Sequence, residues 1–149
     1  MPGTRAALTA TVITEQGPVG LVLAHASRPA RPGLSLSDSE DWADDLHDIA
    51  VAAAAVRGPK LLVGDLQAGP WHADYRRLEA TSGMDDAADA LGRGLRPTWP
   101  SWNGLAINPL DHVLIGGGVR VRYVGTASVG GSAHLALVTE VTVPAAPRG

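Results

Sequence analysis

The residues best suited to chemistry in this sequence lie at the ends of predicted strands. They are His25, Asp65, the neighbouring pair Asp111 and His112, and His134. Carboxylates and imidazoles transfer protons near neutral pH and bind divalent cations, so a group of them could form a catalytic or metal site. Taken singly, each also has a structural explanation, as a hydrogen-bonded surface histidine or as an aspartate in a turn or at a strand edge.

The length and composition predict one domain that spans residues 1–149. The chain has 149 residues, of which 45% are hydrophobic, enough for one proper core. No stretch approaches the roughly 20 apolar residues of a membrane-spanning helix, and the first ten residues do not resemble a signal peptide. We expect a chain that is soluble as written, either cytoplasmic or the soluble part of a larger membrane-associated protein.

Charge and cysteine content exclude several kinds of site. Cysteine is absent, which excludes disulfides, thiolate metal sites and a cysteine nucleophile. The formal net charge is −3, and no basic cluster is dense enough to predict binding to a nucleic-acid duplex.

Hydrophobic periodicity predicts a mixed α/β fold with the element order ββαβααβββ. Ser37–Val56 is predicted as the main helix, because Ser37 and Glu40 have capping-box spacing. One face of this helix is apolar and carries Trp42, Leu46, Ile49, Ala53 and Val56. Two short helices are expected through Tyr75 and Leu78 and near residues 85–91. The predicted strands, expected to form one mainly antiparallel sheet, are Ala6–Ile13, Val19–His25, Leu61–Asp65, Leu110–Ile115, Val119–Thr126 and His134–Val143.

The polar sites follow one another along the chain in an order that resembles the order of motifs in a known family. Leu23-Ala24-His25, a long helix and Leu62-Val63-Gly64-Asp65-Leu66-Gln67-Ala68 come first. Pro97-Thr98-Trp99-Pro100, Leu110-Asp111-His112-Val113-Leu114 and Gly131-Ser132-Ala133-His134 follow. Over about residues 8–143 this order resembles the C-terminal half of the endonuclease/exonuclease/phosphatase superfamily. The members most similar in character are actinobacterial membrane-associated proteins of the teicoplanin-resistance type.

The resemblance implies half of a four-layer α/β/β/α sandwich, with helices on one face of the sheet. It also implies phosphoester hydrolysis at a divalent metal ion, usually Mg²⁺, with Asp65, Gln67 and His134 as metal-site residues. His25 would hydrogen-bond the phosphoryl group, Asp65 would orient the nucleophile, Asp111 would steady the active-site network, and His134 would work with a metal or a base.

The chain departs from the family pattern at three places. The family motif Gly-Asp-Phe-Asn is here Gly64-Asp65-Leu66-Gln67, in which Gln67 extends the amide by one methylene. The family motif Ser-Asp-His is here Ser132-Ala133-His134, so Ala133 lacks the carboxylate that would orient the histidine or help to hold the metal. The asparagine and glutamate that the family's N-terminal half supplies have no counterpart in this sequence.

Two functions remain open from the residues and the resemblance. The chain is either a metal-dependent phosphoesterase that acts when the missing half is supplied, or a catalytically inactive relative that binds a ligand or a protein. A lone half of the sandwich would leave an apolar sheet face in water, so we expect a homodimer or a partner chain with the missing half. A plain α/β interaction domain is a third alternative.

Overall fold

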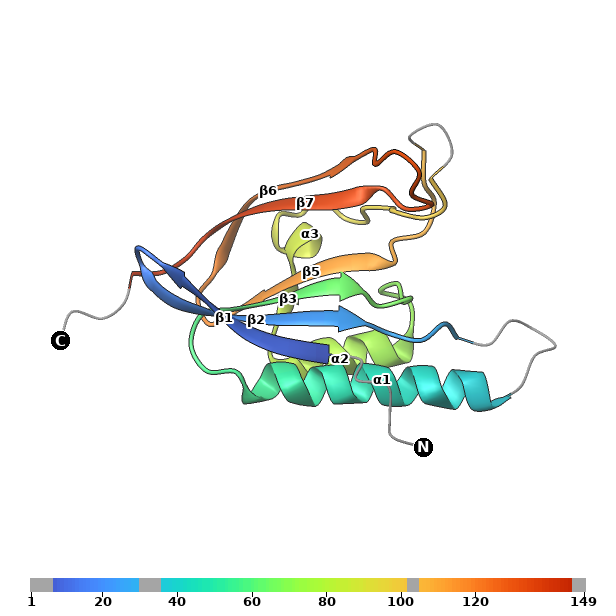
Figure 1. Cartoon of the computed structure of the whole chain (residues 1–149), viewed down its shortest axis with the longest axis horizontal. Coiled ribbons are helices and arrows are strands. Elements are labelled where there is room, and N and C mark those ends of the chain that lie inside the picture. The colour runs from blue at the N-terminus through green and yellow to red at the C-terminus, as the bar shows by residue number, and fades with distance from the viewer. Residues whose placement is uncertain (1–6, 30–35, 102–104, 146–149) are drawn as a thin grey trace.

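The computed structural model describes residues 7–29, 36–101 and 105–145, without the side chains of residues 36–39. Its main sheet has five strands in the order β1-β2-β3-β5-β4, and β6 and β7 form a separate two-stranded sheet. Helices α1 and α2 lie on one side of the main sheet and the β6–β7 hairpin lies on the other (Figure 1). The strands are β1 (Ala7–Thr14), β2 (Gly17–His25), β3 (Lys60–Asp65), β4 (Asp85–Asp86), β5 (Asp111–Gly116), β6 (Arg120–Ala127) and β7 (Ala136–Thr142), and the helices are α1 (Leu36–Ala55), α2 (Ala73–Ser82) and α3 (Ala87–Ala90).

The pairing of the strands confirms the predicted α/β class and the mainly antiparallel sheet. β1 and β2 form an antiparallel hairpin around Glu15 and Gln16. β2 and β3 are parallel, which requires a long connection, and α1 provides it. β5 runs antiparallel to both β3 and β4. Among the described residues, none of the helices combines the length and the apolar composition that crossing a bilayer requires.

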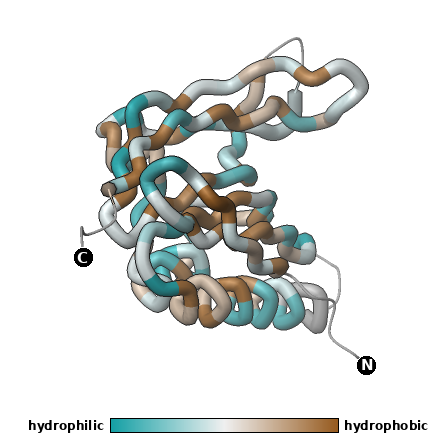
Figure 2. The backbone as a smooth tube through the Cα atoms, turned by 60° about the vertical axis from the view of Figure 1, so that its left-hand side comes forward, coloured by the Kyte–Doolittle hydropathy of each residue, from teal (hydrophilic) through white to brown (hydrophobic). Residues whose placement is uncertain are grey.

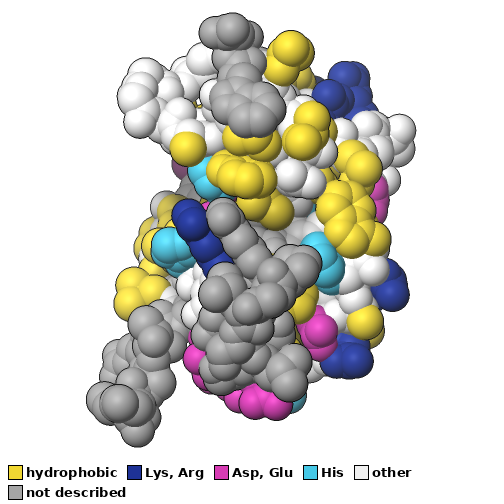
Figure 3. Space-filling view, turned by 90° about the vertical axis from the view of Figure 1, so that its right-hand side faces the viewer, with side chains coloured by type: hydrophobic (Ala, Val, Ile, Leu, Met, Phe, Trp, Pro, Cys, Tyr) yellow, Lys and Arg dark blue, Asp and Glu magenta, His cyan; other side chains and the backbone are white. Residues whose placement is uncertain are grey.

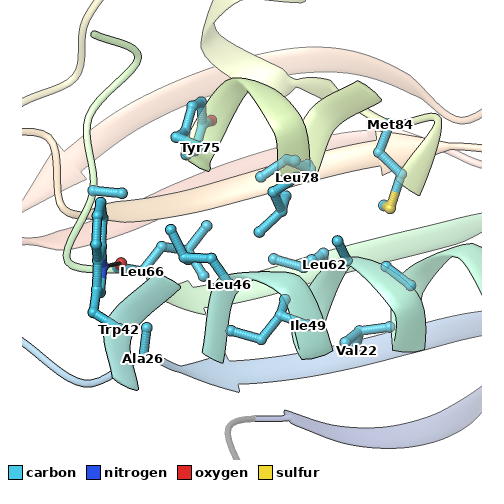
Figure 4. Packing of buried hydrophobic residues seen from close by; sticks show 14 residues of the cluster. Val22, Ala26, Trp42, Leu46, Ile49, Leu62, Leu66, Tyr75, Leu78 and Met84 are labelled. Atoms are coloured by element: carbon cyan, nitrogen blue, oxygen red, sulfur yellow. Dashed lines mark hydrogen bonds between the residues drawn. The ribbon is translucent and has the colours of Figure 1, made fainter. Parts of the chain in front are cut away.

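Helix α1 packs on the sheet through the face that its periodicity predicts. Trp42, Leu46, Ile49 and Ala53 are buried, and Val56 is partly buried just beyond the helix end. Figure 4 shows Trp42, Leu46 and Ile49 packed in one cluster with Val22, Leu62 and Leu66. The Trp42 Nε1–H donates to the Leu66 carbonyl at 3.1 Å, which ties α1 to the loop after β3. The helix begins at Leu36, so the predicted cap Ser37 lies inside it.

The expectation that all six long strands share one sheet is wrong for β6 and β7. After β5, Gly117 and Gly118 have φ angles of 64° and 85°, and they turn the chain out of the main sheet. A Cβ at Gly117 would lie 1.9 Å from the Gly58 carbonyl oxygen, so that position also requires glycine. The hairpin then folds back over β3 and β5, as the tube in Figure 2 shows.

A second apolar cluster lies between the main sheet and the hairpin. Its buried members are Ala87, Ala88, Val113, Ile115, Val119 and Val124, with Leu61, Val63, Leu91, Val121, Leu137 and Val141 partly buried beside them. Helix α3 contributes Ala87 and Ala88, so the expectation that all helices lie on one face is wrong for this short helix. The hairpin thus covers part of the sheet face that α1 and α2 leave open.

The hairpin leaves the β1–β2 end of this face uncovered. Side chains alternate along a strand, and Val22 points to α1, so Leu23 and its cross-strand partner Leu8 point to the opposite face. The exposed fractions are 58% for Leu8, 47% for Val12 and 43% for Leu23. The predicted open apolar face is therefore real, but it is confined to the first two strands.

Candidate functional site

Strand register places three of the four predicted site residues in one row. His25 at the end of β2 pairs with Asp65 at the end of β3, and Asp65 pairs with Asp111 at the start of β5. The three side chains lie on the face opposite α1, because each stands an odd number of residues from a neighbour that packs on α1. Figure 3 views this end of the molecule, where histidine and charged side chains lie below a group of hydrophobic ones.

His134 joins the row from the loop before β7. Its Nδ1 lies 2.8 Å from Asp111 Oδ2, a hydrogen bond in which the imidazole N–H donates to the carboxylate. Its backbone N–H donates to Ser132 Oγ at 3.0 Å. The predicted strand His134–Val143 is thus two residues too long at its start, since β7 begins at Ala136. Asp111 supplies the orienting carboxylate whose loss we expected from Ala133.

The loop after β3 holds Asp65 in place. The backbone N–H of Gln67 donates to Asp65 Oδ1 at 3.0 Å, and Gln67 Nε2 donates to Asp65 Oδ2 at 2.6 Å. Gln67 has a φ angle of 50°, a left-handed conformation that brings its backbone and side chain back to the same carboxylate. His25 is more loosely placed: its Nε2 lies 3.9 Å from Asp65 Oδ2, and 81% of its side chain is exposed.

Thr98 connects the Asp111 and His134 loops. This residue is fully buried, and its Oγ1 accepts hydrogen bonds from the N–H groups of Leu110 and Asp111, both at 3.2 Å. Its carbonyl accepts a hydrogen bond from the Leu135 N–H at 2.8 Å. In the sequence Thr98 belongs to the motif Pro97-Thr98-Trp99-Pro100, which by itself indicates no role for this residue. The structure shows that it fixes the backbone on both sides of the Asp111–His134 pair.

His112 does not belong to the row, although it is the neighbour of Asp111. Successive residues of a strand point to opposite faces, so His112 lies on the helix side with an exposed fraction of 5%. Its Nε2 faces two carbonyl oxygens, Ala68 at 2.8 Å and Pro109 at 3.1 Å, and its Nδ1 lies 2.8 Å from Asp86 Oδ2. The two carbonyls and the Asp86 carboxylate can only accept, so a proton on each ring nitrogen would satisfy all three, which favours the imidazolium form. The Tyr75 hydroxyl also lies 3.0 Å from Nδ1.

The pKa directions agree with a buried His112–Asp86 ion pair. Burial by itself would lower the pKa of His112, but the hydrogen bond and charge of Asp86, together with the two carbonyls, raise it. Burial would likewise raise the pKa of Asp86, but the hydrogen bond and charge of His112 and the hydroxyl of Tyr75 lower it. Tyr75 Oη donates to Asp86 Oδ2 at 2.7 Å. Sequence reasoning missed this pair, because Asp86 is 26 residues from His112 in the chain.

Asp65, Asp111 and His134 together could hold a metal ion. Each offers one ligand atom, and these atoms lie within 4.8 Å of one another. Carboxylate oxygens suit hard cations such as Mg²⁺, which also keeps several waters and needs only one or two protein carboxylates. The residues present therefore fit a divalent cation. Their roles in catalysis, and that of Gln67 as a metal-site residue, stay predictions.

Comparison with known proteins identifies a family for this chain. The model of the Endonuclease/Exonuclease/phosphatase family matches residues 2–134. No curated protein matched the chain in a sequence search. The assignment to the teicoplanin-resistance type stays a prediction.

Several solved structures share the fold at low sequence identity. The endonuclease/exonuclease/phosphatase from Beutenbergia cavernae DSM 12333 is 22% identical, with a TM-score of 0.70 over 93% of this chain and 39% of its own. D. rerio TDP2 complexed with single strand DNA product is 13% identical, with a TM-score of 0.69 over 92% of this chain and 61% of its own. The Bacteroides thetaiotaomicron VPI-5482 mannosyl-6-phosphatase Bt3783 is 14% identical, with a TM-score of 0.53 over 84% of this chain and 51% of its own.

The chain thus spans between 39% and 61% of the length of these three structures. Because the family model covers most of its residues, the chain belongs to the Endonuclease/Exonuclease/phosphatase family.

Proposed function

We propose that this chain forms the C-terminal half of a divalent-metal-dependent phosphoester hydrolase. The observation that carries the proposal is the group Asp65, Asp111 and His134, in which an Asp–His hydrogen bond stands beside a second carboxylate. A buried or structural histidine would not need two carboxylates at an open sheet edge. A metal-assisted hydrolytic site does, because it must hold a cation and activate a water molecule.

Each residue of the row would have a separate task. Asp65, steadied by Gln67, would provide carboxylate oxygens to the cation. Asp111 would hold the His134 ring by its Nδ1–H, so that Nε2 is free to take a proton from the attacking water. The exposed His25 would contact a phosphoryl oxygen. Bound Mg²⁺ would neutralise the negative charge that develops on the phosphate and on the leaving oxygen.

Metal titration tests the proposal without relying on turnover. We expect the chain to bind Mn²⁺, as a calorimetric probe for Mg²⁺, and the Asp65→Asn variant to bind it at least about tenfold more weakly, since loss of even an outer partner costs about that much. Asp85→Asn is the matched control, because Asp85 is exposed and lies outside the group. Equal affinities for all three proteins would refute a metal centre at Asp65. Metal binding without hydrolysis of any phosphoester would favour the inactive, ligand-binding alternative.

We further propose that the uncovered β1–β2 face is completed by a second protein surface. The face presents Leu8, Val12 and Leu23, each more than 40% exposed, beside the site row that ends with His25. Related structures of the same fold contain more chain than this one. Either a partner chain that carries the missing half or a second copy of this chain would bury these side chains, at about 25 cal/mol for each Å² of apolar surface.

Light scattering of the purified chain tests the face. We expect a dimer at micromolar concentration, because no other protein is present to cover Leu8 and Leu23. Leu23→Glu should return the chain to a monomer, since it places a charge in the centre of the buried face. Val138→Glu is the control, because Val138 is 47% exposed on the outer side of β7. A monomer for the unmodified chain, or equal effects of both substitutions, would contradict the proposed interface.

A further inference from the structure

One edge of the main sheet, the outer side of β1, has no partner among the strands that the structure describes. β1 stands at the end of the strand order β1-β2-β3-β5-β4, and Figure 1 shows it at the rim of the sheet. An edge strand presents a row of backbone N–H and C=O groups that another extended segment can bond. These groups point along the sheet, so the edge is a separate surface from the uncovered β1–β2 face.

β1 carries none of the features that usually protect an edge strand. Ala7–Thr14 contains no charged residue and no proline, and its register with β2 continues without a bulge. Proteins protect sheet edges with charged residues, proline, bulges or very short strands. The opposite edge of this sheet follows that rule, because β4 consists of two residues and both are aspartates. The contrast indicates that β1 is the edge at which the sheet accepts a further strand.

Pro18 shows which backbone groups of β1 are free. It pairs with Ile13 but has no N–H, so these two residues do not exchange hydrogen bonds. Bonded and non-bonded residue pairs alternate along an antiparallel ladder. The N–H and C=O groups of Ile13, Thr11 and Thr9 therefore point away from β2, toward the open edge. An added strand would bond these three residues.

An open pocket lies beside this edge, on the helix side of the sheet. Its volume is about 360 Å³, within the range of roughly 300–1,000 Å³ that is usual for ligand pockets. Thr9 and Thr11 point to the helix side, because Ala7 of the same strand packs on the α1 cluster. A strand added to β1 would direct every second side chain to this side as well. The walls of the pocket, which we call the β1 pocket, include Thr9, Thr11, Pro18, Gly20, Val56 and Arg57.

Arg57 brings a positive charge to the β1 pocket. The end of α1 crosses β2 closely because Gly20 has no side chain, and a Cβ there would lie 2.2 Å from Val56 Cγ1. The next residue, Arg57, is exposed. Carbonyls at a helix C-terminus attract cations, but the Ala53 carbonyl already accepts from Lys60 Nζ at 2.8 Å. Within the described part of the chain no ion pair joins Arg57 to a carboxylate, so it can bind one from a partner.

We infer that the β1 edge is a docking site for an extended segment of a partner protein that carries an acidic side chain. The segment runs antiparallel to β1 and bonds Thr9, Thr11 and Ile13 through its backbone. Its acidic side chain lies in the β1 pocket beside Arg57. In this mode of recognition the backbone bonds supply affinity and the pocket supplies specificity. Neither the edge nor the pocket contains a residue of the site row, so the docking site does not depend on the proposed hydrolysis.

Fluorescence anisotropy with labelled peptides tests the docking site. The probe is a capped octapeptide of alternating threonine and valine in which glutamate replaces one central threonine. With the glutamate in the pocket, the N–H groups of the glutamate and of the threonines face β1, and those of the valines face away. We expect N-methyl groups on the glutamate and on its two nearest threonines to weaken binding about a hundredfold, through three lost hydrogen bonds. The same number of N-methyl groups on valines is the matched control and should change the affinity little.

Two variants assign the binding to the pocket and to the edge. Arg57→Glu should weaken the glutamate peptide about fivefold, the scale of an exposed ion pair, and should bind a peptide with lysine in place of the glutamate more tightly than the unmodified chain does. Arg93→Glu is the control, because Arg93 is exposed and does not line the pocket. Thr11→Pro should abolish binding, since it removes an N–H that faces the edge. The exchange of charges at Arg57 needs no proline, so it decides the matter even if Thr11→Pro does not fold.

The outcomes separate the edge from the proposed function. No peptide binding, equal losses for the two sets of N-methyl groups, or the same peptide affinities in Arg57→Glu as in Arg93→Glu would overturn the docking site. A dimer that Thr11→Pro dissociates, in a chain that binds no peptide, would also overturn it and assign the edge to a second copy of the chain. Arg57-dependent peptide binding by a chain that is monomeric and hydrolyses nothing would support the docking site and count against the proposed function.

Discussion

We expect the His134→Ala variant to lose metal-dependent phosphoester hydrolysis by about 10²–10⁴-fold, the usual cost of removing a general base. The reason is the 2.8 Å hydrogen bond between His134 Nδ1 and Asp111 Oδ2, which orients the ring and stabilises the imidazolium that forms when Nε2 takes a proton. Turnover of bis(p-nitrophenyl) phosphate at saturating Mg²⁺, by the chain together with the half that completes the fold, is the measurement. Asp111→Asn should cause a large loss as well, and the double variant should lose little more, because the two residues act as a unit.

Two controls show whether His134 acts as a base. His47→Ala removes an exposed histidine on α1 and should leave turnover unchanged. Added imidazole should restore part of the turnover of His134→Ala, which a purely structural loss would not allow. If His134→Ala instead weakens metal binding and recovers at high Mg²⁺, then His134 is a metal ligand and not the base. Undiminished turnover by His134→Ala would refute both roles.

The Asp86→Asn variant should lower the free energy of unfolding by about 3–5 kcal/mol near pH 6, the usual cost of breaking a buried ion pair. The substitution leaves the His112 imidazolium in a site where the ring is 5% exposed and no longer faces a carboxylate. Urea unfolding measures the change. Asp85→Asn is the control, because Asp85 is the exposed neighbour in the same short strand and should change little.

The pH dependence of this difference follows from the two pKa shifts. The pKa of His112 is raised from its ordinary 6.5, so its contribution is complete below pH 6.5 and is lost as the pH rises through the raised value. The pKa of Asp86 is lowered from its ordinary 3.8, so its contribution is complete above pH 3.8 and is lost in acid, through the lowered value. The difference between the unmodified chain and Asp86→Asn should therefore be largest between these two pH values. A difference that does not vary with pH would show that the pair is not ionised.

The His112–Asp86 pair also links the helix side of the sheet to the site. His112 Nε2–H donates to the Ala68 carbonyl, one residue after Gln67, whose backbone and amide hold Asp65. The same histidine adjoins Asp111 in β5. The buried His112 therefore fixes the backbone beside Asp65 and Asp111. It does so from the helix side of the sheet, opposite the face on which these two carboxylates lie.

The sequence by itself determined those features that depend on local periodicity and chain order. The spacing of Trp42, Leu46, Ile49 and Ala53 defines one helical face, and the structure buries that face. Short apolar runs that end in His25 and Asp65 predict two strands, and they form with nearly the predicted bounds. The order of the polar motifs predicts the family, because chain order is retained when sequence identity is as low as 22%.

The order of the motifs predicts that His25, Asp65, Asp111 and His134 converge at one edge of the sheet, but only the tertiary structure decided which atoms pair there. Alternation along a strand does not say which sheet the strand joins, so β6 and β7 were placed in the wrong one. It also does not identify a partner far away in sequence, so Asp111 as the carboxylate for His134, 23 residues later, was not predicted. Hydrogen bonds and ion pairs between distant segments depend on how whole elements pack. That packing is set by the burial of apolar surface, which has no direction, so an apolar pattern marks a face as buried but does not identify the surface that covers it.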